Sequence, residues 1–313
     1  MRIVIAEFMD EVAVASLRRR FDVLHDAGLV EHRDALVATL DGADALIVRN
    51  RTRVDAELLS FAPRLRVVGR LGVGLDNIDV AACEARKIEV IPARGANALA
   101  VAEYVIGAAI VLLRGAYFAT EAVASGEWPR AALGTGREIA GKTLGLVGFG
   151  SIGQVVGRLG RSLGMAVIGF DAHIPSSAAL WTEQHATPHR LDDLLRAADV
   201  VSLHVPLTPA TRHLIDAEKL ALMRRDAILV NTARGGVVDE VALATALKSG
   251  RLAGAALDVF ESEPLPPGSV LVGCPGLILT PHIAGVTRES NVRVSTMIAE
   301  RVAAALDVVR PGS

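Results

Sequence analysis

The sequence predicts an α/β protein with two parallel sheets, each in its own domain. Its 313 residues exceed the roughly 150 residues typical of one domain. Short runs rich in valine and isoleucine alternate with helical patterns, and continuous apolar strands between helices are typical of parallel sheets covered on both faces. The runs form two series separated by an irregular stretch, so we expect two sheets.

The first series occupies the N-terminal third of the chain. Helical patterns such as Asp10–Arg20 and Asp55–Ala62 separate its members, which is the alternation expected for strands joined by crossover helices. The expected strands are Ile3–Ala6, Asp22–His25, Ala45–Val48, Val67–Arg70 and Glu89–Ile91.

The second series follows a long apolar helix expected from about Ala98 to Ala124 and a glycine-rich, irregular stretch, Ser125–Gly141. Further helices are expected after Ser151, Leu191, Asp216 and Asp239. The expected strands are Leu144–Gly148, Ala166–Phe170, Val200–Val205, Ile228–Asn231, Ala253–Val259 and Leu277–Leu279.

The C-terminal tail, Arg288–Val309, has helical spacing and follows the last expected strand. A helix at this place can pack back on the first domain, which would make that domain discontinuous. We therefore expect one domain from residues 1–97 and 286–313, with a second domain, residues 98–285, inserted into it.

Charge and composition exclude several kinds of partner. The chain has 33 basic and 35 acidic residues, which argues against a broad basic field for nucleic acid. Cys83 and Cys274 form no zinc-binding pattern, so we expect two reduced thiols in a cytoplasmic protein and no metal site. The longest apolar stretch, Ala98–Leu113, falls short of the ~20 residues that cross a bilayer, so no membrane partner is expected.

A glycine-rich turn joins the first strand of the second series to a helix. Gly148, Gly150 and Gly153 form the pattern G-x-G-x-x-G, which allows a tight turn, a close approach of the backbone to a pyrophosphate, and close packing of helix on strand. The helix beginning near Ser151 would direct free N–H groups at the phosphates. The next strand ends at Asp171, about 20 residues after the turn, where a carboxylate binds the adenosine ribose and repels a 2′-phosphate. The pattern therefore predicts NAD rather than NADP.

Three charged or titratable side chains, Arg234, Glu263 and His282, each lie just past an expected strand of the second domain. Taken singly, they could be a surface cation, a solvated turn charge and a structural histidine. Because ligands bind outside the carboxyl ends of strands in open α/β sheets, we expect the three to surround one crevice.

The chemistry of these side chains suits hydride transfer between NAD and a 2-hydroxy acid. Arginine binds a carboxylate through two parallel hydrogen bonds. Histidine titrates near neutral pH and can take the hydroxyl proton as the hydride leaves. A carboxylate on the other imidazole nitrogen fixes the tautomer, and arginine and imidazolium together stabilise negative charge on the carbonyl oxygen during reduction.

These motifs resemble the D-2-hydroxyacid dehydrogenase family, including 3-phosphoglycerate dehydrogenases, over almost the whole chain. The resemblance implies a flavodoxin-like substrate domain interrupted by a Rossmann-like NAD-binding domain. It also implies a homodimer in which the long connector helix and the following loop embrace the partner. The segments that carry the resemblance are Val68–Asp79, Asn97, Ala102–Glu103, Gly148–Gly153, Asn231–Glu240, Ala256–Pro264 and Thr280–Gly285.

The resemblance also implies roles for single residues. Arg234 would bind substrate, Glu263 would pair with His282, and His282 would be the acid/base. Asp258 would meet the nicotinamide amide, and the backbone of Gly72–Gly74 would receive the substrate carboxylate. The implied cofactor site comprises Gly148, Gly150, Ser151, Ile152, Gly153, Asp171, Val205, Thr232, Asp258, His282 and Gly285, and the implied substrate site comprises Arg49, Arg70, Gly72, Val73, Gly74, Asn97 and Arg234.

Arginines in the first domain indicate what kind of substrate the enzyme binds. Arg49 and Arg70 resemble phosphate-side contacts of 3-phosphoglycerate dehydrogenases, whereas Arg51 and Arg53 could equally be solvated surface charge. A second anionic group on a D-configured acid, as in 3-phosphoglycerate or (S)-3-sulfolactate, would suit these cations. The segment Ile5–Glu11 resembles sulfolactate-oxidising members.

Other interpretations of the same motifs remain. A hydroxypyruvate or glyoxylate reductase would leave the arginines without an anionic partner. A non-catalytic NAD-binding regulator similar to the family's corepressors would not need Arg234, Glu263 and His282. Formate dehydrogenases that resemble this fold have a glutamine at the position of Glu263, so Glu263 disfavours formate as the substrate. Oxidation of a phosphonate remains formally open. The sequence ends at Ser313 without the regulatory domains of many 3-phosphoglycerate dehydrogenases, so serine feedback is not expected.

Overall fold

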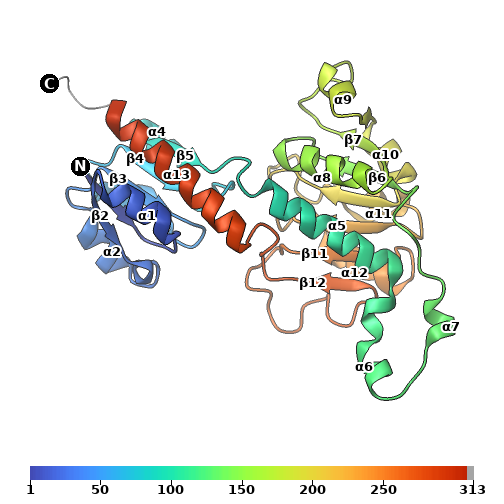
Figure 1. Cartoon of the computed structure of the whole chain (residues 1–313). Helices are drawn as coiled ribbons and strands as arrows, with labels where there is room; N and C mark the ends of the chain where they lie inside the picture. The colour runs from blue at the N-terminus through green and yellow to red at the C-terminus, as the bar shows by residue number, and fades with distance from the viewer. Residues whose placement is uncertain (309–313) are drawn as a thin grey trace. The chain divides into compact units, whose positions relative to one another are not determined.

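The computed structural model describes residues 1–308, which form two compact units (Figure 1). Unit 1 comprises Met1–Asn97 together with the segment from Val286 onward, and unit 2 comprises Ala98–Gly285. Unit 2 is thus inserted between two pieces of unit 1. The last residue of the expected tail helix, Val309, lies outside the described residues.

Unit 1 is built on a parallel sheet. Within residues 1–308 this sheet has five strands in the order β2-β1-β3-β4-β5. The strands are β1 (Arg2–Ile5), β2 (Asp22–His25), β3 (Ala45–Val48), β4 (Val67–Arg70) and β5 (Glu89–Pro92). The helices are α1 (Glu11–Arg18), η1 (Ala27–Glu31), α2 (Arg33–Leu40), α3 (Ala56–Ser60), α4 (Val80–Ala85) and α13 (Arg288–Val308).

Helices cover both faces of this sheet. Buried residues of α1 and α13 pack on one face, and buried residues of α2, α3 and α4 pack on the other. A Cβ added at Gly69 in β4 would come within 2.8 Å of Val302 Cγ2 and 2.9 Å of Ile298 Cγ2. The glycine therefore lets α13 lie close against the sheet (Figure 1).

Unit 2 contains a second parallel sheet. Among the described residues it has seven strands in the order β12-β11-β10-β9-β6-β7-β8. The strand order reverses at β6, which is where α/β sheets of this type bind ligands. The strands are β6 (Thr143–Val147), β7 (Ala166–Phe170), β8 (Thr187–Pro188), β9 (Val200–Leu203), β10 (Ile228–Asn231), β11 (Gly254–Leu257) and β12 (Leu277–Leu279).

Helices also cover both faces of the second sheet. Buried residues of α5 and α8 belong to one apolar cluster, and those of α10, α11 and α12 belong to another. The helices of unit 2 are α5 (Ala98–Arg114), η2 (Ala116–Ala119), α6 (Thr120–Ala124), α7 (Arg130–Leu133), α8 (Ser151–Ser162), α9 (Ala179–Glu183), α10 (Leu191–Ala197), α11 (Ala217–Leu222) and α12 (Glu240–Lys248). The α/β class with two parallel sheets is as predicted.

Local sequence explains where several helices begin. Each of five helices follows an aspartate whose carboxylate accepts a backbone N–H group of the first turn, which satisfies a donor that the helix itself leaves unpaired. These aspartates are Asp10, Asp55, Asp79, Asp216 and Asp239.

The prediction of the connector helix is wrong in length, because the observed helix is shorter than expected. Helix α5 ends at Arg114 rather than at Ala124, because Gly115 takes a left-handed conformation (φ 64°) and ends the helix. The chain continues as η2 and α6, bent by 68° from α5. The stretch expected to be irregular contains α7, and the sequence analysis predicts neither α9 nor the short strand β8.

Among the described residues, no single helix has both the length and the apolar character that a membrane span requires. The bent pair formed by α5 and the segment Ala116–Ala124 meets these criteria by length and composition alone.

Candidate active site

The glycine-rich turn lies between β6 and α8, where the strand order of unit 2 reverses. Gly148 has φ 94°, and a Cβ there would lie 2.6 Å from the His204 carbonyl oxygen. A Cβ at Gly153 would lie 2.3 Å from the Gly148 carbonyl oxygen. Glycine is therefore required at 148 by its positive φ and by the segment that follows β9, and at 153 by the turn itself, which supports the sequence reasoning for these positions.

Gly150 has a different environment. It precedes α8, no side chain caps the helix there, and no heavy atom lies within 4 Å of a Cβ built at this position. The fold itself thus gives no steric reason for glycine at 150. Open space before the N–H groups of a 12-residue helix fits the pyrophosphate of a dinucleotide. Ser151 is exposed and Ile152 half-buried in the first turn of this helix.

Asp171 follows β7 and is tied to the glycine-rich turn. The Phe149 N–H donates to Asp171 Oδ2 at 2.9 Å, and the His173 N–H donates to Oδ1 at 2.8 Å. Each carboxylate oxygen can accept a further hydrogen bond, so Asp171 can also accept hydrogen bonds from ribose hydroxyl groups. The position and orientation of this carboxylate fit an adenosine ribose bound beside the turn.

His204 and Val205 follow β9 and border the turn. The His204 Nε2 atom lies 3.0 Å from Ser202 Oγ, and burial lowers the pKa of His204 to about 3. The imidazole is therefore neutral at physiological pH. A Cβ at Gly148 would also lie 3.1 Å from Val205 Cγ1, so both residues help to shape the turn.

Thr232 and Asn97 are among the residues whose buried polar atoms have no hydrogen-bond partner within residues 1–308. The atoms of these two residues are Thr232 Oγ1 in unit 2, from the predicted cofactor site, and Asn97 Oδ1 in unit 1, from the predicted substrate site. Because buried polar groups in proteins are nearly always paired, both atoms fit contacts with a bound ligand.

His282 and Glu263 form a hydrogen-bonded pair in unit 2. His282 Nδ1 lies 2.7 Å from Glu263 Oε2, and Glu263 Oε1 accepts the Phe260 N–H at 3.0 Å. Since an ionised carboxylate only accepts hydrogen bonds, Nδ1 carries the proton in this pair and Nε2 is left to exchange one. Both side chains are partly exposed, at 41% and 36%, so substrate can reach them. The pair can accept a proton and return it.

Asp258 lies at the end of β11 and holds the segment that carries His282. It is 1% exposed, and its carboxylate accepts hydrogen bonds from Thr280 Oγ1 and from the N–H groups of Ile283 and Ala284. The family resemblance places Asp258 at the nicotinamide amide. The structure adds an anchoring role within unit 2.

Arg234 lies on a turn that follows β10. The buried Asn231 side chain accepts the Ala233 N–H at 3.0 Å and donates to the Arg234 carbonyl oxygen at 3.1 Å. A Cβ at Gly235 would lie 1.7 Å from the Phe260 carbonyl oxygen, so only glycine lets this turn approach that segment. The structure thus brings the turn of Arg234 against the segment whose Phe260 N–H binds Glu263. Gly285 marks the end of unit 2.

In unit 1, Arg49 follows β3 and is held by its own neighbours. Its Nη2 donates to Asn291 Oδ1 at 2.9 Å, and its guanidinium carbon lies 5.8 Å from the centre of the Phe8 ring. Burial lowers the pKa of Arg49, although a guanidinium stays protonated in proteins. Arg51, by contrast, is exposed and pairs with Glu31.

The backbone around Arg49 is fixed by two residues that sequence analysis did not single out as site residues. Buried Glu7 accepts the N–H groups of Arg49 at 2.8 Å and of Thr52 at 3.0 Å. The Asn77 amide donates to the carbonyl oxygens of Arg49 at 3.3 Å and of Thr52 at 2.7 Å. No sequence signal marks Glu7 as buried, because its partners lie more than 40 positions away in the chain.

Arg70 lies over the glycine-rich loop that follows β4. A Cβ at Gly72 would lie 1.4 Å from Arg70 Nη1, so glycine is required for the guanidinium to rest there. The Gly72 N–H donates to the Arg70 carbonyl oxygen at 2.8 Å. The structure thus brings Arg70 together with the loop of Gly72, Val73 and Gly74, as expected for a site that binds an anion.

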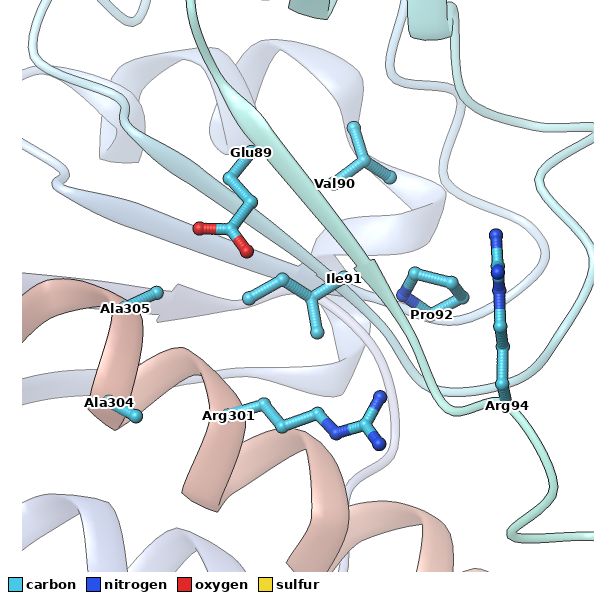
Figure 2. Close-up of a pocket in the computed structure, with 8 residues that line it drawn as sticks. All are labelled: Glu89, Val90, Ile91, Pro92, Arg94, Arg301, Ala304 and Ala305. Carbon is cyan, nitrogen blue, oxygen red and sulfur yellow. The ribbon is translucent and has the colours of Figure 1, made fainter.

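A separate hollow of about 580 Å³ lies between β5 and α13 in unit 1 (Figure 2). Its lining includes Ile91, Arg94, Arg301 and Ala304, and it includes none of the predicted site residues. The hollow and the predicted site are therefore distinct.

Known proteins identify the family. Residues 106–284 match the model of the D-isomer specific 2-hydroxyacid dehydrogenase, NAD binding domain. The chain is 56% identical, over 98% of its length, to the (S)-sulfolactate dehydrogenase of Chromohalobacter salexigens, of which it covers 98%. The chain belongs to the D-isomer specific 2-hydroxyacid dehydrogenases. The predicted family is confirmed, as are NAD as the cofactor and the enzyme class, an oxidoreductase acting on CH–OH groups of 2-hydroxy acids.

Other members of the family show the range of relatives. The chain is 39% identical, over 96% of its length, to the D-3-phosphoglycerate dehydrogenase of Methanocaldococcus jannaschii, of which it spans 57%. The crystal structure of D-lactate dehydrogenase from Aquifex aeolicus, complexed with NAD and lactic acid, has a TM-score of 0.83 and 28% identity, with full coverage of both chains.

Proposed function

We propose that this dehydrogenase interconverts (S)-3-sulfolactate and 3-sulfopyruvate with NAD. The observation that carries the proposal is the Arg49 guanidinium, held in place by Asn291 and Phe8 on a backbone segment fixed by Glu7. A cation held in this way suits a second anionic group on the substrate. The 56% identity to an (S)-sulfolactate dehydrogenase supports sulfonate as that group. (S)-Sulfolactate has the same spatial arrangement as D-glycerate, so it suits an enzyme for D-isomers.

In this proposal His282 is the acid/base. During oxidation the hydride leaves substrate C2 for NAD, and the hydroxyl proton goes to His282 Nε2. Glu263 fixes the tautomer through its 2.7 Å bond to Nδ1 and offsets the imidazolium charge. Arg234 and the backbone of Gly72–Gly74 bind the carboxylate, and Arg49 and Arg70 bind the sulfonate.

3-Phosphoglycerate is the second candidate substrate. It shares the configuration and carries an anion at the same carbon, and the relationship to D-3-phosphoglycerate dehydrogenases supports it. Phosphate carries more negative charge than sulfonate. We therefore expect the kcat/KM values for the two substrates to differ, and a direct comparison distinguishes them.

The test is NADH oxidation with four 2-oxo acids: 3-sulfopyruvate, 3-phosphohydroxypyruvate, hydroxypyruvate and glyoxylate. We expect 3-sulfopyruvate to have the highest kcat/KM. In Arg49→Gln this value should fall about 10- to 100-fold, since a charge-assisted hydrogen bond is lost, while glyoxylate changes less than about 3-fold. Arg51→Gln is the matched control, because Arg51 is exposed and pairs with Glu31. If the wild-type enzyme prefers glyoxylate or hydroxypyruvate, the proposal that the substrate carries a second anionic group is refuted.

We further propose that the enzyme is a homodimer and that it works in the cytoplasm. Exposed apolar side chains gather along η2, α6 and the segment before α7, and Figure 1 shows α6 and α7 on a long connection that projects from the sheet of unit 2. Such a patch supports a protein partner. The free thiols Cys83 and Cys274 support a reducing compartment. The exposed apolar residues are Tyr117 (62%), Phe118 (54%), Val123 (45%) and Trp128 (78%).

Trp128→Glu is expected to convert the dimer to a monomer, because it places a charge in the apolar contact. Sedimentation velocity measures the result. Val241→Glu is the matched control, since Val241 is also exposed in unit 2 but lies on α12, away from this patch in the chain. A wild-type monomer at micromolar concentration contradicts the proposal.

A further inference from the structure

The segment that carries His282 is wrapped around one buried carboxylate. Asp258 Oδ1 accepts hydrogen bonds from Thr280 Oγ1 at 2.6 Å and from the Ile283 N–H at 2.8 Å, and Oδ2 accepts the Ala284 N–H at 2.8 Å. The Asp258 carbonyl oxygen accepts the His282 N–H at 2.8 Å. Residues on both sides of the histidine are thus tied to Asp258.

His282 itself has an unusual backbone conformation. Its φ of 54° lies in the left-handed region, which side chains with a Cβ rarely adopt. Such a conformation persists only where the surroundings impose it. Here it directs the next two N–H groups, of Ile283 and Ala284, at the same carboxylate, which is the concave arrangement of amides that binds anions in loops. Asp258 therefore stabilises the conformation that presents His282.

The chain of donors continues into helix α5. Tyr104 Oη lies 2.6 Å from Thr280 Oγ1. The threonine hydroxyl has one proton, and it donates that proton to Asp258. Tyr104 must then be the donor to Thr280, so the order is Tyr104 to Thr280 to Asp258. The tyrosine hydroxyl fixes the rotation of the threonine hydroxyl, and the threonine in turn orients the carboxylate.

We propose that Tyr104, Thr280 and Asp258 are positioning residues that hold His282 in its reactive place, an inference that rests on the proposed acid/base role of His282. Two independent anchors act on this histidine. Glu263 fixes the imidazole ring at Nδ1, and Asp258 fixes the backbone that carries the ring. Because proton transfer requires the imidazole within hydrogen-bond reach of the substrate oxygen, loosening the backbone anchor lowers kcat even with the Glu263 pair intact.

The test compares Thr280→Val, which is nearly isosteric but lacks the hydroxyl, with Thr280→Ser, which retains it. We expect Thr280→Val to lower kcat about 10-fold or more, and Thr280→Ser to restore most of the loss. Tyr104→Phe, which removes only the outermost donor, should lower kcat about 2- to 5-fold. The NADH dissociation constant, measured by fluorescence titration, should stay within about 2-fold of wild type in all three variants.

Parallel measurements separate the possible causes of a loss. His282→Ala is assayed beside these variants: if it keeps full turnover, the acid/base role itself is refuted. If His282→Ala is inactive but Thr280→Val has wild-type kcat, the positioning role is refuted. A Thr280→Ser variant as impaired as Thr280→Val, or a loss that appears only in NADH affinity, also overturns the proposal. Thermal melting of each variant shows whether it is folded at the assay temperature.

Discussion

Replacing His282 by alanine is expected to lower kcat about 1,000-fold, because general acid/base catalysis by a positioned side chain contributes about 10²- to 10⁴-fold. His282 Nδ1 is hydrogen-bonded to Glu263 Oε2 at 2.7 Å, so Nε2 is the nitrogen that exchanges the proton with the substrate. Stopped-flow and steady-state rates with 3-sulfopyruvate and NADH measure the loss. A variant that binds NADH and keeps full turnover removes His282 from the mechanism.

Glu263→Gln is the matched comparison for His282→Ala. The amide can still accept the Nδ1 proton, but it no longer offsets the charge of the imidazolium. We expect kcat for reduction to fall about 10-fold, less than in His282→Ala. Steady-state rates with 3-sulfopyruvate and NADH measure the change. A kcat for reduction equal to that of wild type would show that Glu263 has no electrostatic role.

Short-range patterns predicted most of the fold. The strands Ala45–Val48, Val67–Arg70 and Ile228–Asn231 are bounded in the structure as predicted, because continuous aliphatic runs in a buried parallel sheet leave few other choices. The predictions were wrong where a single residue determines the end of an element. Gly115 ends α5 by taking a left-handed conformation, although the apolar helical pattern continues beyond it.

Two glycines of the turn were predicted from a local motif. Gly148 takes a positive φ of 94°, and a side chain at Gly153 would collide with the Gly148 carbonyl oxygen within the same turn. Residues that act through distant partners were not predicted. Glu7 binds the backbone of Arg49, 42 positions away, and Tyr104 meets Thr280 across 176 positions. Such pairs depend on how strands and helices are arranged, which periodicity does not specify.

Two arginines of the first domain illustrate the same limit. In the sequence only the family resemblance distinguishes Arg49 from Arg51, which lies two residues further along. In the structure Arg49 is held by Asn291 and Phe8, while Arg51 points to Glu31 as an exposed pair. Since exposed ion pairs contribute little, the two differ in what they can do for a substrate.

Exchanging Asp171 for asparagine is expected to raise the NADP:NAD ratio of kcat/KM about 100-fold. The carboxylate lies where the ribose is proposed to bind, and a 2′-phosphate there would meet a like charge, a juxtaposition that costs several kcal/mol. Removing about 2.7 kcal/mol of repulsion corresponds to that ratio. Steady-state kinetics with both cofactors measures it.

Asp171→Ala separates the charge of this residue from its structural role. Asp171 accepts the Phe149 and His173 N–H groups, and asparagine keeps one acceptor oxygen while alanine keeps none. Both variants remove the repulsion, but alanine should also weaken NAD binding, because the glycine-rich turn loses its tie to β7. An unchanged NAD:NADP ratio in the asparagine variant would mean that the charge of Asp171 does not select the cofactor. The selection would then have to come from the shape of the turn around His173 rather than from electrostatics.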